Sequence, residues 1–416
     1  MYQAVRGTTD ILPAEQPYWR YVEQAVADIS RLYGYQRIDT PVFEDTSLFR
    51  RSTGEYTDIV QKEMYTFDDR GGNSLTLKPE GTPPVCRAYV QHGLQNLPQP
   101  VKLYYIAPIF RYDRPQAGRY RQHYQFGCEA IGEADPTLDA EVIDMAWRFY
   151  KSLGLVHISL QLNSIGCKTC RPGYLSALKD YYHRYVTKLC EDCKIRLERN
   201  PLRLLDCKQP SCQKIAASAP KNADHLCQEC SEHFKRLQKY LGLLGIPFEL
   251  NDSLVRGLDY YTRTVFEIQP AGEEGAQSTL GGGGRYDDLI EELGGKPTPA
   301  IGFATGIERI ILNLKKEGVA VPTPPDLQVL VAYLGDAPRE EAVKLAASLR
   351  QAGISAVAAT GGKSLKAQMR QANSLKVRYT VIIGEDEVKA GTATLRDMAS
   401  ARQETVPIGE LPARLN

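Results

Sequence analysis

The sequence predicts an α+β fold for residues 1–325 and a small α/β domain for residues 326–416. In the first part, strand-like and helical segments are mixed without the regular strand–helix alternation of a doubly wound sheet. The proline-rich stretch Val321–Pro325 (VPTPP) then interrupts the pattern as a hinge would. The residues after this hinge do alternate strand and helix, and 416 residues exceed what one compact core usually holds.

The first part begins with a predicted helix over residues 15–33, where apolar side chains recur at helical spacing and Gly34 follows as a C-terminal cap. A strand-like run over residues 35–43 comes next. Period-two and apolar patterns predict further strands at 74–77, 101–110, 124–129 and 265–268, and helices at 140–153 and 307–316. Such an order indicates a largely antiparallel sheet with helices packed on it.

Residues 167–250 differ from their surroundings, and we interpret them as an inserted helical domain. They hold 15 lysine and arginine residues against 9 aspartate and glutamate residues. They also hold eight of the ten cysteines, arranged as four close pairs: Cys167 with Cys170, Cys190 with Cys193, Cys207 with Cys212, and Cys227 with Cys230. Two such pairs suffice for one tetrahedral zinc site, so the spacing predicts structural zinc without saying which pairs combine.

Two alternatives for these cysteines are buried or free thiols and, less favoured in a reducing compartment, redox pairs. The remaining cysteines, Cys86 and Cys128, stand outside the pattern and are expected in the core. The N-terminal residues lack the features of a signal or transit peptide, and no apolar run is long enough for a membrane helix. We therefore expect a cytoplasmic protein.

The segment with the most side chains suited to binding or catalysis is residues 110–129, FRYDRPQAGRYRQHYQFGCE. The formal net charge of +1 gives no global sign of a nucleic-acid partner, so local clusters must supply it. Here four arginines fall within eleven residues around a turn at Pro115 and Gly118, namely Arg111, Arg114, Arg119 and Arg121. Arginine suits bidentate contact with phosphate, so this hairpin is suited to polyanions. The alternative is a solvated charged turn, which would not need the interleaved tyrosines.

Three further segments are ambiguous when taken singly. LTLKPEGT (75–82) places Glu80 in a common type of turn, and LVRGLDYYT (254–262) is also typical of an ordinary segment that leads into a strand. The glycine run 281–284 and GFATGIERI (302–310) indicate backbone that passes close to a ligand, although glycine-rich hairpins do the same.

Together, these segments resemble the class II aminoacyl-tRNA synthetases. RGTTDILP, LTLKPEGT, the arginine hairpin, LNSIG, GGRYD and GFATGIERI occur in the order of that class, and LVRGLDYYT is specific to the histidyl-tRNA synthetase family. The resemblance covers nearly the whole chain and identifies a bacterial-type member with a cysteine-rich insertion. Two departures are mild: Asp113 stands where glutamate is often found, and the run 281–284 has more glycines than the usual pair.

The resemblance implies an antiparallel-sheet catalytic domain, 1–325, interrupted by the insertion 167–250, and a C-terminal α/β anticodon-binding domain, 326–416. It implies that ATP, as its Mg²⁺ complex, activates histidine to histidyl-adenylate and pyrophosphate, and that histidine then passes to the 3′ end of its tRNA. A homodimer is also implied, with the segment around Pro41 in its interface.

Roles for individual residues follow from the same resemblance. Arg256 and Arg111 would be catalytic, and Arg111, Arg119 and Arg309 would bind ATP. The residues expected to bind histidine are Glu80, Gly81, Thr82, Gln125, Glu129, Arg256, Tyr260, Tyr261 and Tyr286. The residues expected to contact tRNA are Arg114, Gln116 and Arg121 in the hairpin and Lys363, Lys366 and Arg370 in the C-terminal domain. The C-terminal group could equally be a solvated helix face.

Two other classes of protein fit parts of this sequence. One is the non-catalytic paralogue of the family, a histidine-sensing regulatory subunit of ATP phosphoribosyltransferase. That paralogue usually lacks the anticodon-binding domain and disturbs the catalytic arginine motif, whereas this chain retains both. The other is a tRNA-binding scaffold without catalysis, which would leave Glu80, Arg111, Arg256 and Arg309 without a role.

Overall fold

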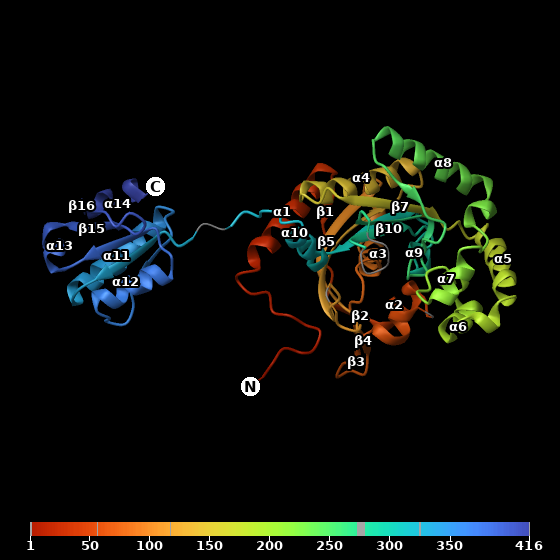
Figure 1. The fold of residues 1–416 in the computed structure, drawn as a ribbon, viewed down its shortest axis with the longest axis horizontal. Helices are drawn as coiled ribbons and strands as arrows, with labels where there is room; N and C mark the ends of the chain where they lie inside the picture. The colour runs from red at the N-terminus through yellow and green to blue at the C-terminus, as the bar shows by residue number, and fades with distance from the viewer. Residues whose placement is uncertain (1, 56, 117, 273–278, 324–325, 416) are drawn as a thin grey trace. The chain divides into compact units, whose positions relative to one another are not determined.

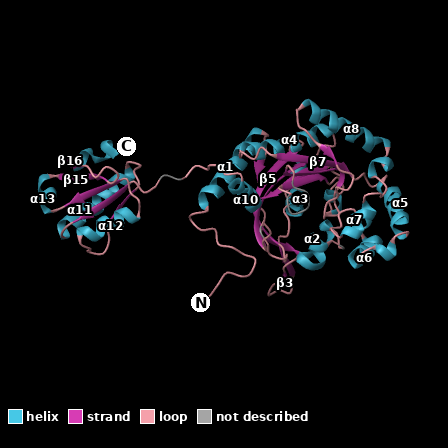
Figure 2. Cartoon of the chain, viewed as in Figure 1, coloured by secondary structure: helices cyan, strands magenta, loops and turns pink. Residues whose placement is uncertain are grey.

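The computed structural model describes residues 2–55, 57–116, 118–272, 279–323 and 326–415. The chain forms two compact units, Met1–Val321 and Pro322–Asn416. We call the first the catalytic unit, after the domain that the resemblance implies, and the second the C-terminal unit. Part of the proline-rich hinge, residues 324 and 325, lies outside the described residues. Figures 1 and 2 show that both units combine helices with a sheet. The catalytic unit has two hydrophobic cores and the C-terminal unit has one.

An eight-stranded sheet forms the centre of the catalytic unit. In spatial order its strands are β1 (Gln36–Arg37), β5 (Val101–Phe110), β6 (Gln122–Ile131), β11 (Ala300–Gly306), β10 (Gly281–Arg285), β9 (Thr262–Pro270), β7 (Ile158–Ser164) and β8 (Glu249–Leu250). The inner pairs are antiparallel, and only the edge pairs β1–β5 and β7–β8 are parallel. The predicted α+β class with a largely antiparallel sheet is confirmed.

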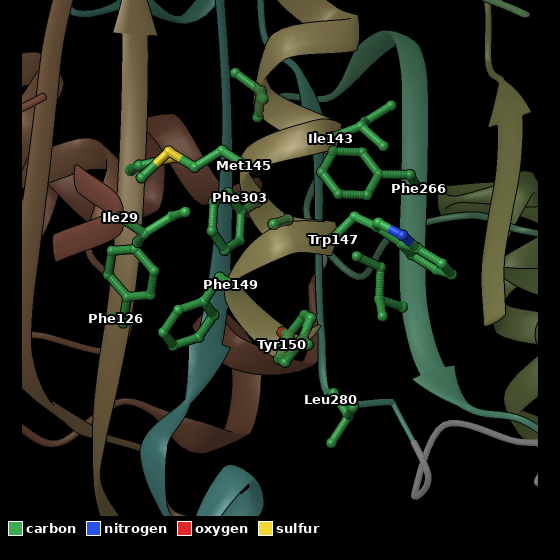
Figure 3. Close-up of a cluster of buried hydrophobic side chains, with 14 of the residues drawn as sticks. Ile29, Phe126, Ile143, Met145, Trp147, Phe149, Tyr150, Phe266, Leu280 and Phe303 are labelled. Carbon is green, nitrogen blue, oxygen red and sulfur yellow. The ribbon is translucent and has the colours of Figure 1, made fainter. Parts of the chain in front are cut away.

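Helices cover both faces of this sheet. One face carries α1 (Gln16–Leu32), α4 (Pro136–Ser152), α8 (Gln228–Leu243) and α10 (Ile307–Lys316), whose apolar side chains form one core with the strands. Figure 3 shows part of this core, where Phe149 of α4 lies near Phe126 and Phe303 of the sheet. The other face packs on α3 (Thr82–Gln91), α9 (Leu289–Glu292) and three helices of the insertion, α5 (Arg171–His183), α6 (Glu191–Arg199) and α7 (Pro210–Ala216).

Successive side chains of β6 point alternately to the two faces of the sheet, as in any β-strand. Phe126 and Cys128 point into the core with α4, whereas Gln125 and Glu129 belong to the opposite face. The spacing of four between Gln125 and Glu129 therefore places both on the side of the sheet where the site is built.

The predicted strand over residues 35–43 is in fact two short strands in two sheets. Gln36–Arg37 (β1) joins the main sheet, and Phe43–Asp45 (β2) joins a three-stranded sheet with β4 (Ser74–Leu77) and β3 (Thr66–Asp68). Pro41 lies between them and has no N–H to donate to a ladder, which explains the interruption. The short helix α2 (Thr46–Thr53) follows β2.

Residues 167–250 are helical for most of their length. They contain α5 (Arg171–His183), α6 (Glu191–Arg199), α7 (Pro210–Ala216) and α8, with 3-10 turns at Val186–Lys188 (η3), Pro201–Leu204 (η4) and Asn222–His225 (η5). Figure 1 shows α5, α6 and α7 beyond the edge of the main sheet. The chain returns to the sheet at β8, which pairs with β7.

The C-terminal unit is a five-stranded sheet in the order β13 (Ala356–Ala358), β12 (Val329–Tyr333), β14 (Tyr379–Ile383), β15 (Thr392–Asp397) and β16 (Gln403–Pro407). Its helices are α11 (Asp336–Gln351), α12 (Leu365–Ser374), α13 (Glu385–Ala390) and α14 (Leu411–Leu415). The first three strands are parallel, as strand–helix alternation requires. Strands β15 and β16 were not predicted, because few of their residues are apolar and buried. Among the described residues, no helix is both long and apolar enough to cross a membrane.

Candidate active site

A cavity of about 380 Å³ opens on the site-bearing side of the main sheet. Its lining includes every residue predicted to bind histidine or ATP, from Glu80 to Arg309. The members are Glu80, Gly81, Thr82, Arg111, Arg119, Gln125, Glu129, Arg256, Tyr260, Tyr261, Tyr286 and Arg309. The antiparallel order brings β6, β10 and β11 side by side, so segments that are far apart in the sequence meet at one place.

Glu129 on β6 is the most enclosed acid of the cavity, with an exposed fraction of 1%. Its carboxylate accepts hydrogen bonds from the Thr82 hydroxyl at 2.7 Å and from the Tyr286 hydroxyl at 2.5 Å. Burial raises the pKa of Glu129 to about 8, although both hydroxyls act in the opposite direction. The carboxyl group is thus poised to ionise when a ligand offers it a donor or a positive charge.

Glu80 lies at the start of α3 and is also buried. It accepts hydrogen bonds from the hydroxyl groups of Thr53 and Tyr260, both at 2.7 Å. Burial raises the pKa of Glu80, against the effect of these two donors and of Arg111. Thr53, at the end of α2, was missed by sequence reasoning, because a threonine in a short helix carries no signal of its own.

Tyr105 was missed for a similar reason, although it lines the same cavity. A Cβ at Gly81 or Gly127 would overlap the Tyr105 ring, so both glycines leave room for it. The Tyr105 hydroxyl and the Gln125 Oε1 are buried without a hydrogen-bond partner among the described residues. Buried polar atoms of this kind fit a cavity whose ligand supplies the missing partners.

Three arginines line the cavity beside β5, β6 and α10. Arg111 donates from Nε to the Pro79 carbonyl at 2.7 Å, and Arg309 donates to the carbonyls of Thr279 at 2.6 Å and Gly118 at 3.1 Å. Arg119 pairs with Asp113 at 3.1 Å. Backbone carbonyls hold Arg111 and Arg309 without neutralising them, which leaves a positive wall suited to phosphates.

His123 lines the cavity beside this wall and was not predicted. Burial, followed by the charges of Arg111 and Arg309, lowers the pKa of His123 to about 3. The ring is therefore neutral at physiological pH and offers an uncharged planar surface among cations. In the sequence it stands just before the predicted strand 124–129, among arginines and tyrosines that dominate the segment, so nothing marked it as a cavity residue.

Arg256 lies in the segment between β8 and β9 and donates to Glu267 of β9. Glu267 also accepts a hydrogen bond from Thr279 at 3.0 Å. Burial lowers the pKa of Arg256, but the negative charge of Glu267 acts against this effect, and the net result is a raised pKa. A Cβ at Gly282 would meet the Arg256 guanidinium at 2.9 Å, so the glycine run of β10 provides the space that Arg256 occupies. Glu267 was not predicted, because it alternates with apolar residues as any half-exposed strand residue does.

The residues predicted to contact tRNA lie outside the cavity lining. Arg114 and Gln116 are exposed in the loop between β5 and β6. Arg121 stacks on the Tyr112 ring, with 3.9 Å between guanidinium carbon and ring centre, and donates to the carbonyls of Arg6 and Asp113. In the C-terminal unit, Lys363, Lys366 and Arg370 are exposed, and none forms an ion pair with another described residue.

The eight paired cysteines form two groups of four thiols. The first cluster contains Cys167, Cys170, Cys227 and Cys230, and the second cluster contains Cys190, Cys193, Cys207 and Cys212. Within each cluster all sulfur atoms lie within 4.8 Å of one another. Pairs such as Cys167–Cys170 at 3.8 Å and Cys167–Cys227 at 3.9 Å match the edge of about 3.8 Å of a tetrahedron with zinc–sulfur bonds near 2.3 Å. Both sets of donors therefore fit one tetrahedral ion each.

Comparisons with known proteins agree with this geometry. A family model described as histidyl-tRNA synthetase matches residues 7–169 and 176–310, and one described as anticodon binding domain matches residues 328–416. A histidine–tRNA ligase of Dehalococcoides mccartyi strain 195 is 63% identical, over 99% of this chain and 98% of its own length. A histidine–tRNA ligase of Desulforamulus reducens is 52% identical, over 98% and 97%. The crystal structure of apo histidyl-tRNA synthetase from S. aureus matches all of both chains with a TM-score of 0.84 and 38% identity. The chain belongs to the histidyl-tRNA synthetase family.

Proposed function

We propose that this chain catalyses histidine–tRNA ligation: it activates histidine with ATP to histidyl-adenylate and pyrophosphate, and then transfers histidine to the 3′ end of its tRNA. The ligase activity is that of the family to which the chain belongs. The observation that carries the proposal is one cavity lined both by the buried carboxyl groups of Glu80 and Glu129 and by a set of arginines. Such a cavity can hold a zwitterionic amino acid next to a polyphosphate.

The carboxylate side would bind histidine. Glu80, Thr82 and Gln125 would surround the α-ammonium group, since an acid and two neutral oxygen acceptors suit one cation. A neutral imidazole has one donor and one acceptor nitrogen, and Glu129 and Tyr261 would serve these two nitrogens. Gly81 would give the ligand close access to the backbone, and Tyr260 and Tyr286 would line the pocket while holding the two carboxylates by hydrogen bonds.

The arginine side would bind ATP, with its magnesium complex as the substrate. Arg111 would contact the α-phosphate, and Arg119 and Arg309 would contact the β- and γ-phosphates. Arg256 would bridge the histidine carboxylate and the α-phosphate, so that the attacking oxygen and the phosphorus are held in line. Arg256 and Arg111 would therefore stabilise the charge that develops at the reacting centre. In the second step the 3′ hydroxyl of the terminal adenosine would attack the adenylate.

The tRNA would contact both units. We assign its acceptor end to Arg114, Gln116 and Arg121 of the hairpin, aided by the basic insertion 167–250. We assign its anticodon to residues 326–416, which overlap the match to the anticodon-binding family, with Lys363, Lys366 and Arg370 meeting phosphates. A cytoplasmic homodimer with the Pro41 segment at its interface completes the proposal.

The two cysteine clusters would each hold a structural zinc ion. The sulfur separations described above support this role, and the ions would stabilise the insertion without touching substrate. Metal analysis of protein purified without chelator tests the assignment. About two zinc ions per chain would support two sites, about one would support a single site, and less than about half an ion would overturn the assignment.

Histidine-dependent exchange of pyrophosphate into ATP tests the catalytic proposal and separates it from the regulatory paralogue. A histidine sensor would bind histidine without exchange, whereas a ligase exchanges pyrophosphate and charges tRNA. The match over residues 328–416 favours the ligase, because the paralogue usually lacks that domain. Histidine binding without exchange, in protein that is folded and loaded with ATP and magnesium, would overturn the catalytic proposal.

A further inference from the structure

The segment Leu254–Tyr261 carries three of the residues assigned above to histidine activation: Arg256, Tyr260 and Tyr261. None of its residues belongs to a helix or a strand. A segment without regular hydrogen bonds keeps one conformation only when other groups hold its backbone and side chains. The groups that hold this segment therefore matter for the geometry of the cavity.

The catalytic unit supplies two of these holding contacts from its sheet and helices. Asn163 of β7 donates to the Leu254 carbonyl at 3.0 Å, at the beginning of the segment. The Asp259 N–H donates to the Thr53 carbonyl at 3.2 Å, two residues before Tyr261. Two further contacts hold side chains of the segment: the Tyr260 hydroxyl donates to Glu80 at 2.7 Å, and Arg256 pairs with Glu267. None of these four contacts is made by the backbone of Tyr261, the residue assigned to the imidazole ring.

Arg171, the first residue of α5 in the inserted domain, provides that contact. Its guanidinium Nη2 donates to the Tyr261 carbonyl at 2.5 Å and to the Gly166 carbonyl at 3.2 Å, and its Nε donates to the Ile165 carbonyl at 3.4 Å. One planar, charged group thus joins the chain just after β7 to the chain just before β9. Hydrogen bonds from a charged donor are stronger than neutral ones, and guanidinium geometry suits several acceptors at once.

Arg171 is itself fixed by the first cysteine cluster. It directly follows Cys170, and its backbone N–H donates to the Cys167 carbonyl at 2.9 Å. A second contact between the insertion and the segment, from the Asn200 amide to Asp259 at 2.7 Å, is exposed to solvent and therefore weaker. The half-buried Arg171 contact is the one that can fix the backbone of the pocket.

We propose that Arg171 is a positioning residue for histidine binding: through the Tyr261 carbonyl it holds Tyr261, and with it the end of the segment Leu254–Tyr261, in the conformation that receives the histidine side chain. This inference rests on the proposed function, because it assumes that the cavity activates histidine. It extends that function to a residue of the inserted domain that lines no part of the cavity.

The test compares Arg171→Met with Arg184→Met in the full-length protein. Methionine keeps the unbranched apolar stem and removes the donors, and Arg184 is an exposed arginine at the other end of the same helix. Steady-state pyrophosphate exchange gives kcat and the KM values for histidine and for ATP. Equilibrium titration calorimetry with histidine alone measures binding without chemistry.

For Arg171→Met we expect kcat/KM for histidine to fall by about tenfold to hundredfold, as for the loss of a hydrogen bond from a charged donor. The KM for ATP should change by less than about threefold, because Arg111 and Arg309 are held by carbonyls that this contact does not touch. Arg171→Lys, which keeps a charged donor of similar reach, should recover part of the loss. Arg184→Met should behave as the natural protein.

A merely structural role gives a different result. If Arg171→Met lowered stability and changed both KM values in parallel, or changed neither, the positioning role would be overturned while the proposed function stood. Should Arg171→Met fail to fold, Arg171→Lys decides: equal losses toward histidine and ATP, or no loss at all, would sink the inference. Absence of histidine-dependent exchange in the natural protein would instead overturn the proposed function, and this inference with it.

Discussion

Glu80 and Glu129 of the catalytic unit are 3% and 1% exposed, whereas Lys363, Lys366 and Arg370 of the C-terminal unit lie open to solvent. Both regions gather ionisable side chains, yet they hold them in opposite ways. The carboxylates are fixed by hydroxyl groups at 2.5 to 2.7 Å. The cations on and before α12 form no ion pair with a described residue and are exposed to water.

This difference separates two ways of using charge. In the cavity, the carboxyl groups are buried and held by hydrogen bonds, so a change of one group alters both the pKa and the geometry of its neighbours. On the C-terminal surface, each cation contributes a small, screened attraction that sums over many contacts. Single substitutions should therefore have large effects in the cavity and small, salt-dependent effects on the surface.

Arg256→His offers the largest expected effect. The change removes a guanidinium that Glu267 holds and that is proposed to stabilise the charge of the transition state. The barrier to adenylate formation should rise by about 3 to 4 kcal/mol, which lowers the rate by a factor of hundreds. Histidine binding, measured by calorimetry, should weaken far less. Arg184→His is the control, because that arginine is exposed and lines no part of the cavity. Near-normal turnover in Arg256→His would remove Arg256 from the mechanism.

Glu129→Gln should change stability with pH. Because burial raises the pKa of Glu129 from 4.5 to about 8, the folded protein without ligand favours the neutral carboxyl. The stability due to this preference is present below pH 4.5 and is lost as the pH rises through about 8. Glutamine does not ionise, so the stability of the variant relative to the natural protein should increase as the pH rises, by about 3 kcal/mol between low pH and about pH 7.

Thermal or urea unfolding at several pH values measures this difference. Glu23→Gln, at an exposed position of α1, is the control and should follow the natural protein at every pH. A constant difference between Glu129→Gln and the natural protein from about pH 5 to about pH 9 would contradict the raised pKa.

Removal of the C-terminal unit tests whether the two regions work independently. A chain that ends at Pro325 keeps both cores of the catalytic unit, since neither core contains a residue beyond Val319. We expect pyrophosphate exchange within about threefold of the full chain, and tRNA charging lower by at least about tenfold, or 1.4 kcal/mol. Single-turnover charging at limiting tRNA gives the comparison. Unimpaired charging by the shortened chain would exclude an anticodon-reading role for residues 326–416.

Much of the fold could be predicted from periodicity, and its failures have local causes. Strand β5 and helix α10 were predicted with the bounds that the structure has, because their apolar spacing is regular and their ends are marked. β15 was missed because it buries few apolar residues, Ala393 and Leu395. The run 35–43 was predicted as one strand, since a sequence pattern does not show that its two halves pair in different sheets.

The residues of the cavity also divide into those that the sequence predicted and those that it missed. Residues in distinctive motifs, such as Glu80 and Arg256, were predicted from the family resemblance. Thr53 and Tyr105 were missed because their importance comes only from three-dimensional neighbours: one holds Glu80, and the other fills the space left by two glycines. Which cysteine pairs lie together could not be predicted either, since pair spacing is the same for any combination.

The smallest expected effect belongs to the C-terminal surface. Lys366 and Arg370 lie one turn apart on α12, so both can meet one stretch of phosphate backbone. Alanine at both positions should weaken tRNA binding by about twofold to fivefold near physiological salt, and should lower the slope of log K against log salt by about 1.4 to 1.8. Filter binding over a range of salt concentrations measures both quantities.

Lys344→Ala supplies the matched control, because its ammonium group on α11 is already paired with Glu341 at 2.8 Å. It should leave the salt slope unchanged. If the double substitution on α12 left the slope unchanged as well, these cations would be a solvated helix face and the phosphate contact would have to lie elsewhere on the unit. If the loss instead reached the size expected for Arg256→His, solvated charges would be contributing as much as buried ones. The contrast between the cavity and the surface would then be wrong.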